Sequence, residues 1–169
     1  KVQRLSGGEF VARRWKKDIA EYRSVVFVRH SSPVKRLADL VGRSIAFEEP
    51  FSSSGYLLPA GELQQQGLKM VPAEAGGSRQ IVSYRFTQGE ENTLLWVLRG
   101  RADAGAMADY VFKKLSAPVS SELRPIHYSK VVPYHVVVLR PGLSAAVRSA
   151  IHQRLVTMKD DPEGQRILH

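Results

Sequence analysis

Three consecutive hydroxyl side chains and a glycine are the residues of this chain best suited to hold an anion. They are Ser52, Ser53, Ser54 and Gly55. The apolar run at residues 44–47 is typical of a buried strand, and residues 57–66 have the pattern of a helix that stops at Gly67. A helix N-terminus that follows a strand presents free backbone N–H groups and the positive end of the helix dipole. This position therefore favours binding of a phosphate-like oxyanion.

The same serines have a simpler interpretation. One of them would act only as an N-cap, and the others would fill a polar loop. Three hydroxyls in a row, beside a glycine that lets a ligand approach the backbone, shift the balance towards anion recognition. Tyr56 comes next and has two open interpretations: it faces the ligand, or it packs against Leu57 and Phe86.

The stretch around the serines resembles a signature of the phosphate-, phosphite- and phosphonate-binding proteins of ABC transporters. It reads Phe47-Glu48-Glu49-Pro50-Phe51-Ser52-Ser53-Ser54-Gly55-Tyr56-Leu57-Leu58-Pro59. In that family an aspartate–proline pair, a small residue and a Ser-Thr-Ser-Gly-Tyr run occupy these positions. Residues 22–29, 37–42, 98–106 and 161–164 are similar to further family segments in the same order. The resemblance thus covers nearly all of residues 22–169.

The resemblance implies an α/β fold with the two-lobed, type II architecture of periplasmic binding proteins (the Venus flytrap), in which two crossing strands join the lobes. Residues 1–42 would be the remainder of the first lobe and a crossing strand, with 22–30 running with that lobe. Residues 43–122 would be the second lobe with the anion-binding loops. Residues 123–169 would be a return strand and C-terminal helices packed on the first lobe. The family's opening strands and helices have no counterpart here, so the first lobe is expected to be N-terminally incomplete and able to pair with a second copy.

The resemblance also implies a function in which the chain binds a solute and does not catalyse a reaction. The chain would be the solute-binding component of an ABC transporter and would hold a small phosphorus oxyanion (phosphonate, phosphite or phosphate) in the interlobe cleft for uptake. It would need a permease as partner, no cofactor and no metal, and would work in the periplasm, with a membrane anchor left open. The alternative is a ligand-sensing input domain of the same fold, attached to a histidine kinase or a diguanylate cyclase.

Two acids complete the ligand site that the resemblance implies. Glu90 falls where many family members carry a histidine near the ligand, and Asp109 lies in a segment that supplies a ligand-facing acid. Both also have a simpler interpretation, because acids that open a helix interact favourably with its dipole. A carboxylate beside a phosphoryl oxygen is repulsive, so two ligand-facing acids would select a monoanion or a ligand with its own donor.

The order of elements along the chain predicts how these residues meet. A hairpin over residues 10–20 is followed by a buried strand at 22–29 and a short helix at 34–41. Three strand–loop–helix units then begin at residues 45, 82 and 102 and indicate a parallel layer. The loops Ser52–Tyr56, Gly89–Glu91 and Met107–Asp109 should therefore meet at the carboxyl edge of the sheet. Strands at 123–128 and 134–139 precede a long amphipathic helix capped by Ser144.

Composition and the spacing of particular residue types argue against several other classes of function. The chain has 169 residues, a formal charge of +9 and no cysteine, which excludes thiol nucleophiles and thiolate metal sites. Its basic residues are scattered and form no nucleic-acid-binding arm, so nucleic acid is not an expected partner. The five histidines are dispersed, without metal-ligand spacing. No nucleophile–base pair stands out, so no catalytic residue is predicted and an enzyme is not expected.

Overall fold

The computed structural model describes residues 7–15, 19–76 and 79–168 of the chain. The chain divides into two compact units: unit 1 is drawn from Lys1–Tyr22 and Val132–His169, and unit 2 is Arg23–Val131. The predicted boundaries differ from this division. Residues 23–42 and 123–131 belong to unit 2, because the strands that they contain hydrogen-bond within its sheet.

Unit 2 is built on a six-stranded sheet with the order β5-β6-β4-β7-β3-β8. Its strands are β3 (Ser24–Arg29), β4 (Ser44–Phe47), β5 (Met70–Pro72), β6 (Val82–Phe86), β7 (Ala104–Ala108) and β8 (Leu123–Tyr128). β4, β6 and β7 are parallel, as the three repeated strand–loop–helix units predict, and β5 adds a fourth parallel strand beside β6. β3 runs antiparallel to both of its neighbours, β7 and β8, so the sheet is mixed.

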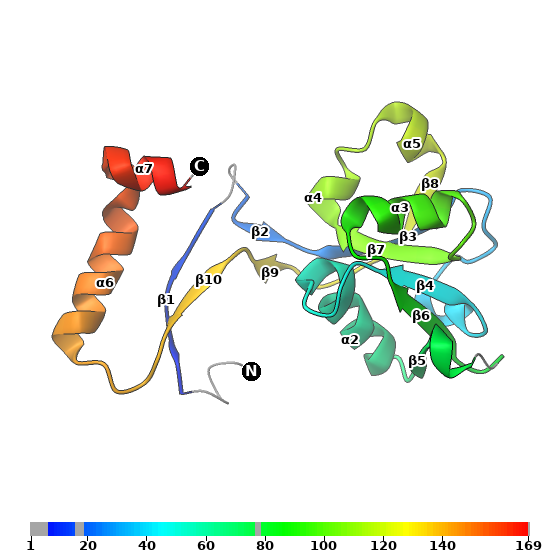
Figure 1. The fold of residues 1–169 in the computed structure, drawn as a ribbon, viewed down its shortest axis with the longest axis horizontal. Coiled ribbons are helices and arrows are strands. Elements are labelled where there is room, and N and C mark those ends of the chain that lie inside the picture. The colour runs from blue at the N-terminus through cyan, green and yellow to red at the C-terminus, as the bar shows by residue number, and fades with distance from the viewer. Residues whose placement is uncertain (1–6, 16–18, 77–78, 169) are drawn as a thin grey trace. The chain divides into compact units, whose positions relative to one another are not determined.

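Helices cover both faces of this sheet, with α2 and α3 on opposite sides (Figure 1). The helical elements of unit 2 are η1 (Leu37–Leu40), η2 (Ser53–Leu57), α2 (Leu58–Gln65), η3 (Ala73–Ala75), α3 (Glu90–Leu98), α4 (Asp109–Phe112) and α5 (Ala117–Ser121). The strand of the third predicted strand–loop–helix unit, β7, ends later than predicted. Met107 and Ala108 belong to β7 and not to the loop, because they pair with Val25 and Ser24 of β3.

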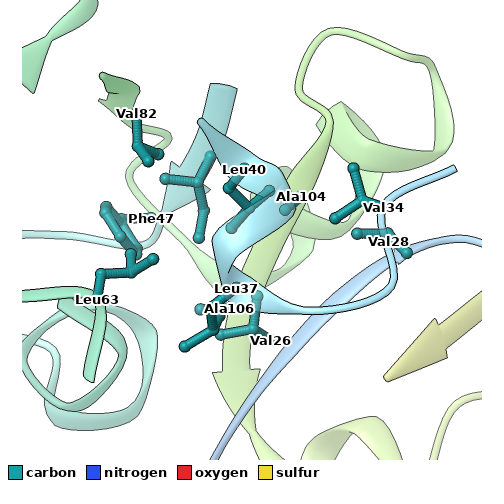
Figure 2. Close-up of a cluster of buried hydrophobic side chains, with 11 residues drawn as sticks. Val26, Val28, Val34, Leu37, Leu40, Phe47, Leu63, Val82, Ala104 and Ala106 are labelled. Atoms are coloured by element: carbon teal, nitrogen blue, oxygen red, sulfur yellow. The ribbon is translucent and has the colours of Figure 1, made fainter. Parts of the chain in front are cut away.

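The core of unit 2 has one apolar cluster on each side of the sheet. Residues 24–28 of β3 are all buried, which confirms the prediction of a strand covered on both faces. Figure 2 shows the cluster on the η1 and α2 side, where Val26, Leu37, Phe47 and Leu63 lie together. The cluster on the α3 side includes Phe27, Val97 and Met107. The sheet is therefore held rigidly from both sides, and the loops at its ends start from fixed positions.

Unit 1 contains two short antiparallel pairs. β1 (Glu9–Arg13) pairs with β10 (Val136–Leu139), and β2 (Glu21–Tyr22) pairs with β9 (Val132–Pro133). The predicted N-terminal hairpin is wrong, because the partner of β1 is a strand from the far end of the chain. The register sets Phe10 against Val138 and Ala12 against Val137, whereas Glu9 and Arg13 lie opposite Leu139 and Val136. Residues 16–18 of the predicted turn lie outside the described residues.

The C-terminal part of unit 1 is helical and comprises α6 (Ala145–Thr157), η4 (Met158–Asp160) and α7 (Pro162–Leu168). Ser144 caps α6 as predicted, since its Oγ accepts from the N–H of Val147 at 3.3 Å. The apolar positions of α6 are not buried within the described residues, and Val147 is 45% exposed. Of the described helices, none has the length and apolar content that a bilayer crossing requires.

Candidate functional site

The loops predicted to meet do leave the sheet of unit 2 at one edge. β4, β6 and β7 are parallel, so their carboxyl ends point the same way. The segment after β6 is bonded to the segment after β4, because Thr87 and Gln88 donate their N–H groups to the carbonyls of Phe47 and Glu48, both at 2.9 Å. η2 lies against β7 and β3. The serine loop is therefore central to this edge.

Ser52 is the N-cap of the first helical turn and uses its hydroxyl inside the protein. Its Oγ accepts from the N–H of Gly55 at 3.0 Å and donates to Oε2 of Glu48 at 2.6 Å. The N-cap interpretation is thus confirmed for this serine. Because a hydroxyl has one proton, Ser52 in this arrangement shapes the loop and has no donor left for a ligand.

Gly55 is required by the packing of the loop on Glu48. A Cβ atom at this position would lie 2.6 Å from Cβ of Glu48 and 2.8 Å from Oγ of Ser52, closer than real contacts allow. The N–H of Glu48 also donates to the carbonyl of Gly55 at 3.3 Å. The absence of a side chain therefore has an internal cause, in addition to the ligand approach that the sequence suggests.

The two remaining serines have donors that the loop does not use. The amide N–H groups of Ser53 and Ser54 donate to no acceptor within the described part of the chain. Ser53 is exposed, whereas Ser54 is buried and its carbonyl accepts from Oγ of Ser24 at 2.6 Å. η2 continues directly into α2, so both N–H groups stand at the positive end of one helical segment. This is the local chemistry that an oxyanion needs.

Tyr56 belongs to an aromatic cluster on the α2 side of the sheet. Its ring centroid lies 4.9 Å from that of Phe86 and 5.0 Å from that of Phe47. Burial, and then the neighbouring Tyr56, raise the pKa of Tyr84. The predicted packing against Phe86 is present, and the ring of Tyr56 fixes the serine loop to the sheet.

Asp109 begins α4 as a buried, paired carboxylate. It accepts from Nζ of Lys113 at 2.9 Å and from the backbone N–H of Arg23 at 3.3 Å, and Nε of Arg23 lies 3.5 Å away. Burial alone would raise the pKa of Asp109, but the hydrogen bonds from Lys113 and Arg23 lower it on balance. Asp109 is therefore ionised at neutral pH and already has two cationic partners.

Arg23 and Lys113 are the charged residues that sequence reasoning missed at this edge. The i, i+4 spacing of Asp109 and Lys113 on one helix was an available signal for the lysine. Arg23 has no local signal, because Asp109 lies 86 positions away. The guanidinium of Arg23 is 4.3 Å from the ring centroid of Tyr128, which holds it in place. Two cations surround one carboxylate, so this cluster has a net positive charge.

Glu90 is the first residue of α3 and is half-buried. Glu91 follows it in the first turn, so both acids stand where the helix dipole favours negative charge. Gly89 caps the helix through its backbone, and the carbonyl of Gly89 accepts from Oγ1 of Thr93 at 3.0 Å. In the described residues no group of three His, Asp or Glu side chains could hold a metal ion.

A comparison of the sequence with models of known protein families shows which family the chain belongs to. The family model described as "ABC transporter, phosphonate, periplasmic substrate-binding protein" matches residues 1–169. The chain belongs to this family. Its members are substrate-binding proteins of transporters, and they act outside the cytoplasm.

Solved structures place the fold among type II periplasmic binding proteins. XAC2383 from Xanthomonas citri, bound to ATP, has a TM-score of 0.86 and 25% identity over 99% of this chain and 63% of that one. PhnD1 from Prochlorococcus marinus, in complex with methylphosphonate, has a TM-score of 0.62 and 20% identity over 95% of this chain and 61% of that one.

A third solved structure shows that the same fold serves other solutes. An ancestral arginine-binding protein bound to arginine has a TM-score of 0.58 and 15% identity over 99% of this chain and 65% of that one. The second and third likenesses are of fold alone. The chain spans less than two thirds of the length of all three proteins.

Proposed function

We propose that this family member is the solute-binding part of an ABC transporter and that its serine loop holds a small phosphorus oxyanion. The observation that carries the proposal is the pair of unused N–H groups on Ser53 and Ser54, at the start of a helical segment. The hydroxyls of the same two residues add two further donors. The protein would deliver its ligand to a permease from the periplasm.

The charge of the ligand is offset by the protein itself. Asp109 on its own would repel an anion, but Lys113 and Arg23 outweigh it. We therefore expect the site to accept the dianion of a phosphonate or phosphate, and not to select the monoanion. No metal is needed, because the helical segment and the two cations supply the compensating positive charge.

The known ligands of similar proteins support a phosphoryl group. The structure from Prochlorococcus marinus holds methylphosphonate and the one from Xanthomonas citri holds ATP. Arginine, the ligand of the third protein, has no phosphoryl group. The unused backbone N–H groups of Ser53 and Ser54 are donors, which match the acceptor oxygens of a phosphoryl group, whereas a guanidinium has donors only.

Isothermal titration of the full-length protein with a panel of solutes tests the proposal. The panel comprises phosphate, phosphite, methylphosphonate, 2-aminoethylphosphonate, ATP, sulfate and arginine. We expect saturable binding of at least one phosphorus oxyanion and none of arginine. Binding of arginine or sulfate alone, or of no solute in the panel, contradicts the assignment.

A further inference from the structure

The sheet of unit 2 is strongly asymmetric where β4 lies beside β6. The two strands are parallel and in register, so alternate residues of both face the same side. The α2 side receives large side chains, namely Ile45, Phe47, Tyr84 and Phe86. The opposite side receives Ser44, Ala46, Ser83 and Arg85. Ala46 is buried in the cluster on the α3 side, so the small Ser44 and Ser83 mark where this side of the sheet is less covered.

A groove of about 420 Å³ lies over these small side chains. Its lining includes Ser44, Ala46, Ser83, Arg85, Trp96 and Arg101. A second hollow of about 380 Å³ shares Tyr84, Arg85 and Trp96 with it and extends it towards Glu74. The size of the groove falls within the range of natural small-molecule sites, which is roughly 300–1,000 Å³.

The groove combines an aromatic wall with positive charge. Trp96 is anchored because it also packs against the apolar cluster on the α3 side. Nε of Arg85 lies 3.2 Å from Oε1 of Glu74, whereas the guanidinium of Arg101 contacts no acid within the described residues. The lining of the larger hollow contains two arginines and no carboxylate. Guanidinium groups bind carboxylates and phosphates in a fork geometry, and indole rings stack on planar groups.

This groove is remote from the serine loop along the strands. Ser44 is the first residue of β4, whereas the serine loop follows the last residue of that strand. Arg101 likewise precedes β7, whereas Asp109 follows it. The groove thus lies towards the amino end of these strands, and the proposed anion site lies at their carboxyl end.

We propose that this groove is a second ligand site, which binds a small planar anion such as an aromatic carboxylate. The planar group packs on Trp96, and the anionic group pairs with Arg101. Ala46, which is already buried, forms part of the floor of the groove beneath the ligand. This inference does not depend on the function of the serine loop.

Nuclear magnetic resonance of the tryptophan side chains tests the proposed second site. The 169-residue chain contains only Trp15 and Trp96, so their indole signals are easily told apart by substitution. The Trp15→Phe variant leaves the indole N–H of Trp96 as a single reporter. We expect 2-naphthoate to shift this signal saturably. The neutral 2-naphthamide should bind at least about tenfold more weakly, because it lacks the negative charge that pairs with Arg101. Acetate should cause no shift, because it lacks the planar ring that packs on Trp96.

A matched pair of arginine variants completes the test in the same Trp15→Phe background. Arg101→Gln should weaken 2-naphthoate binding at least about tenfold. Arg99→Gln should leave it unchanged, because Arg99 is exposed and does not line the groove. Replacing Ser53 and Ser54 by alanine should also leave the Trp96 signal unchanged. No saturable shift of that signal, equal effects of the two arginine variants, or loss of binding in the serine variant would each overturn the proposal.

Discussion

Oγ of Ser52 lies 2.6 Å from Oε2 of Glu48, and the same Oγ accepts from the N–H of Gly55. Glu48 is thus the residue that fixes the serine loop, although it is not one of the residues proposed to contact the ligand. Removal of its carboxylate should leave the loop less ordered before the ligand binds, and ordering then has a cost in affinity.

Glu48→Ala should weaken oxyanion binding about tenfold, which corresponds to the loss of about one such hydrogen bond. Glu48→Gln should stay within about threefold of the parent, because its amide oxygen still accepts from Ser52. Glu49→Ala is the control, since Glu49 is adjacent and exposed. Titration calorimetry checks this, and equal affinities for Glu48→Ala and Glu49→Ala would disprove the positioning role.

Replacing Ser53 and Ser54 together by alanine should weaken binding at least about a hundredfold. Each lost donor to a desolvated anion is worth about 1.5–3 kcal/mol. The matched control is the double replacement of Ser120 and Ser121, whose hydroxyls donate only to carbonyls of their own helix. The melting temperature of the ligand-free protein should change little. Undiminished affinity would mean that the hydroxyls of Ser53 and Ser54 do not bind the ligand.

Gly55→Ala should destabilise the ligand-free protein by about 1–3 kcal/mol, because the added methyl group overpacks the contact with Glu48. Gly61→Ala in α2 is the opposite case, since nothing lies within 4 Å of its added Cβ. This second change should stabilise by about 0.5–1 kcal/mol. Urea unfolding measures both. If Gly55→Ala leaves the free energy of unfolding unchanged, the loop accommodates the methyl group without strain.

The lowered pKa of Asp109 predicts acid sensitivity. A carboxyl group with a depressed folded-state pKa contributes stability above its unfolded pKa, near 3.9, and loses that contribution as pH falls through the folded value. Unfolding free energy should therefore decline below about pH 4. Asp109→Asn should cost about 1–3 kcal/mol at pH 7 and flatten this decline. Asp160→Asn, at an exposed pair with Lys159, should cost almost nothing. If the free energy of unfolding declines equally in the parent and in Asp109→Asn, the acid sensitivity does not come from Asp109.

Lys113 should contribute to ligand charge recognition. Affinity for methylphosphonate should rise with pH through the second ionisation of the ligand, because the Asp109 cluster is net positive. Lys113→Met should reduce that rise and weaken dianion binding about three- to tenfold. Lys114→Met removes the same charge one residue later and should have little effect. Calorimetry between pH 5.5 and pH 8.5 measures this, and a falling or flat affinity in the parent would favour the monoanion instead.

Local patterns were sufficient to predict most of unit 2. The alternation of apolar and turn residues gave the parallel strands and their helices, since each signal lies within about fifteen residues. The serine loop could be placed because Gly55 and the three hydroxyls stand between a strand and a helix. The pairing of the N-terminal strand was predicted wrongly, because the partner of β1 is the distant β10 and no local pattern encodes such a pairing.

The sequence also did not show which site residues use their polar groups inside the protein. The hydroxyl of Ser52 has a partner only four positions away, yet nothing in the sequence distinguishes it from Ser53 as the N-cap. The pairing of Asp109 with Arg23 depends on the antiparallel position of β3 beside β7. A resemblance can indicate which residues lie near a ligand, but it cannot show which of them already have partners.

The position of β3 between β7 and β8 has a consequence for synthesis on the ribosome. Ser24 at its start hydrogen-bonds to Ser129, which lies 105 positions later in the chain. At the usual speed of about 5–20 residues per second, roughly 5–20 s separate the emergence of these partners. Until β7 has emerged, which takes up most of this time, the Val- and Phe-rich strand has neither neighbour available. The nascent chain therefore exposes this apolar segment before its partners, and a holding chaperone that binds apolar extended segments should improve the yield of folded protein.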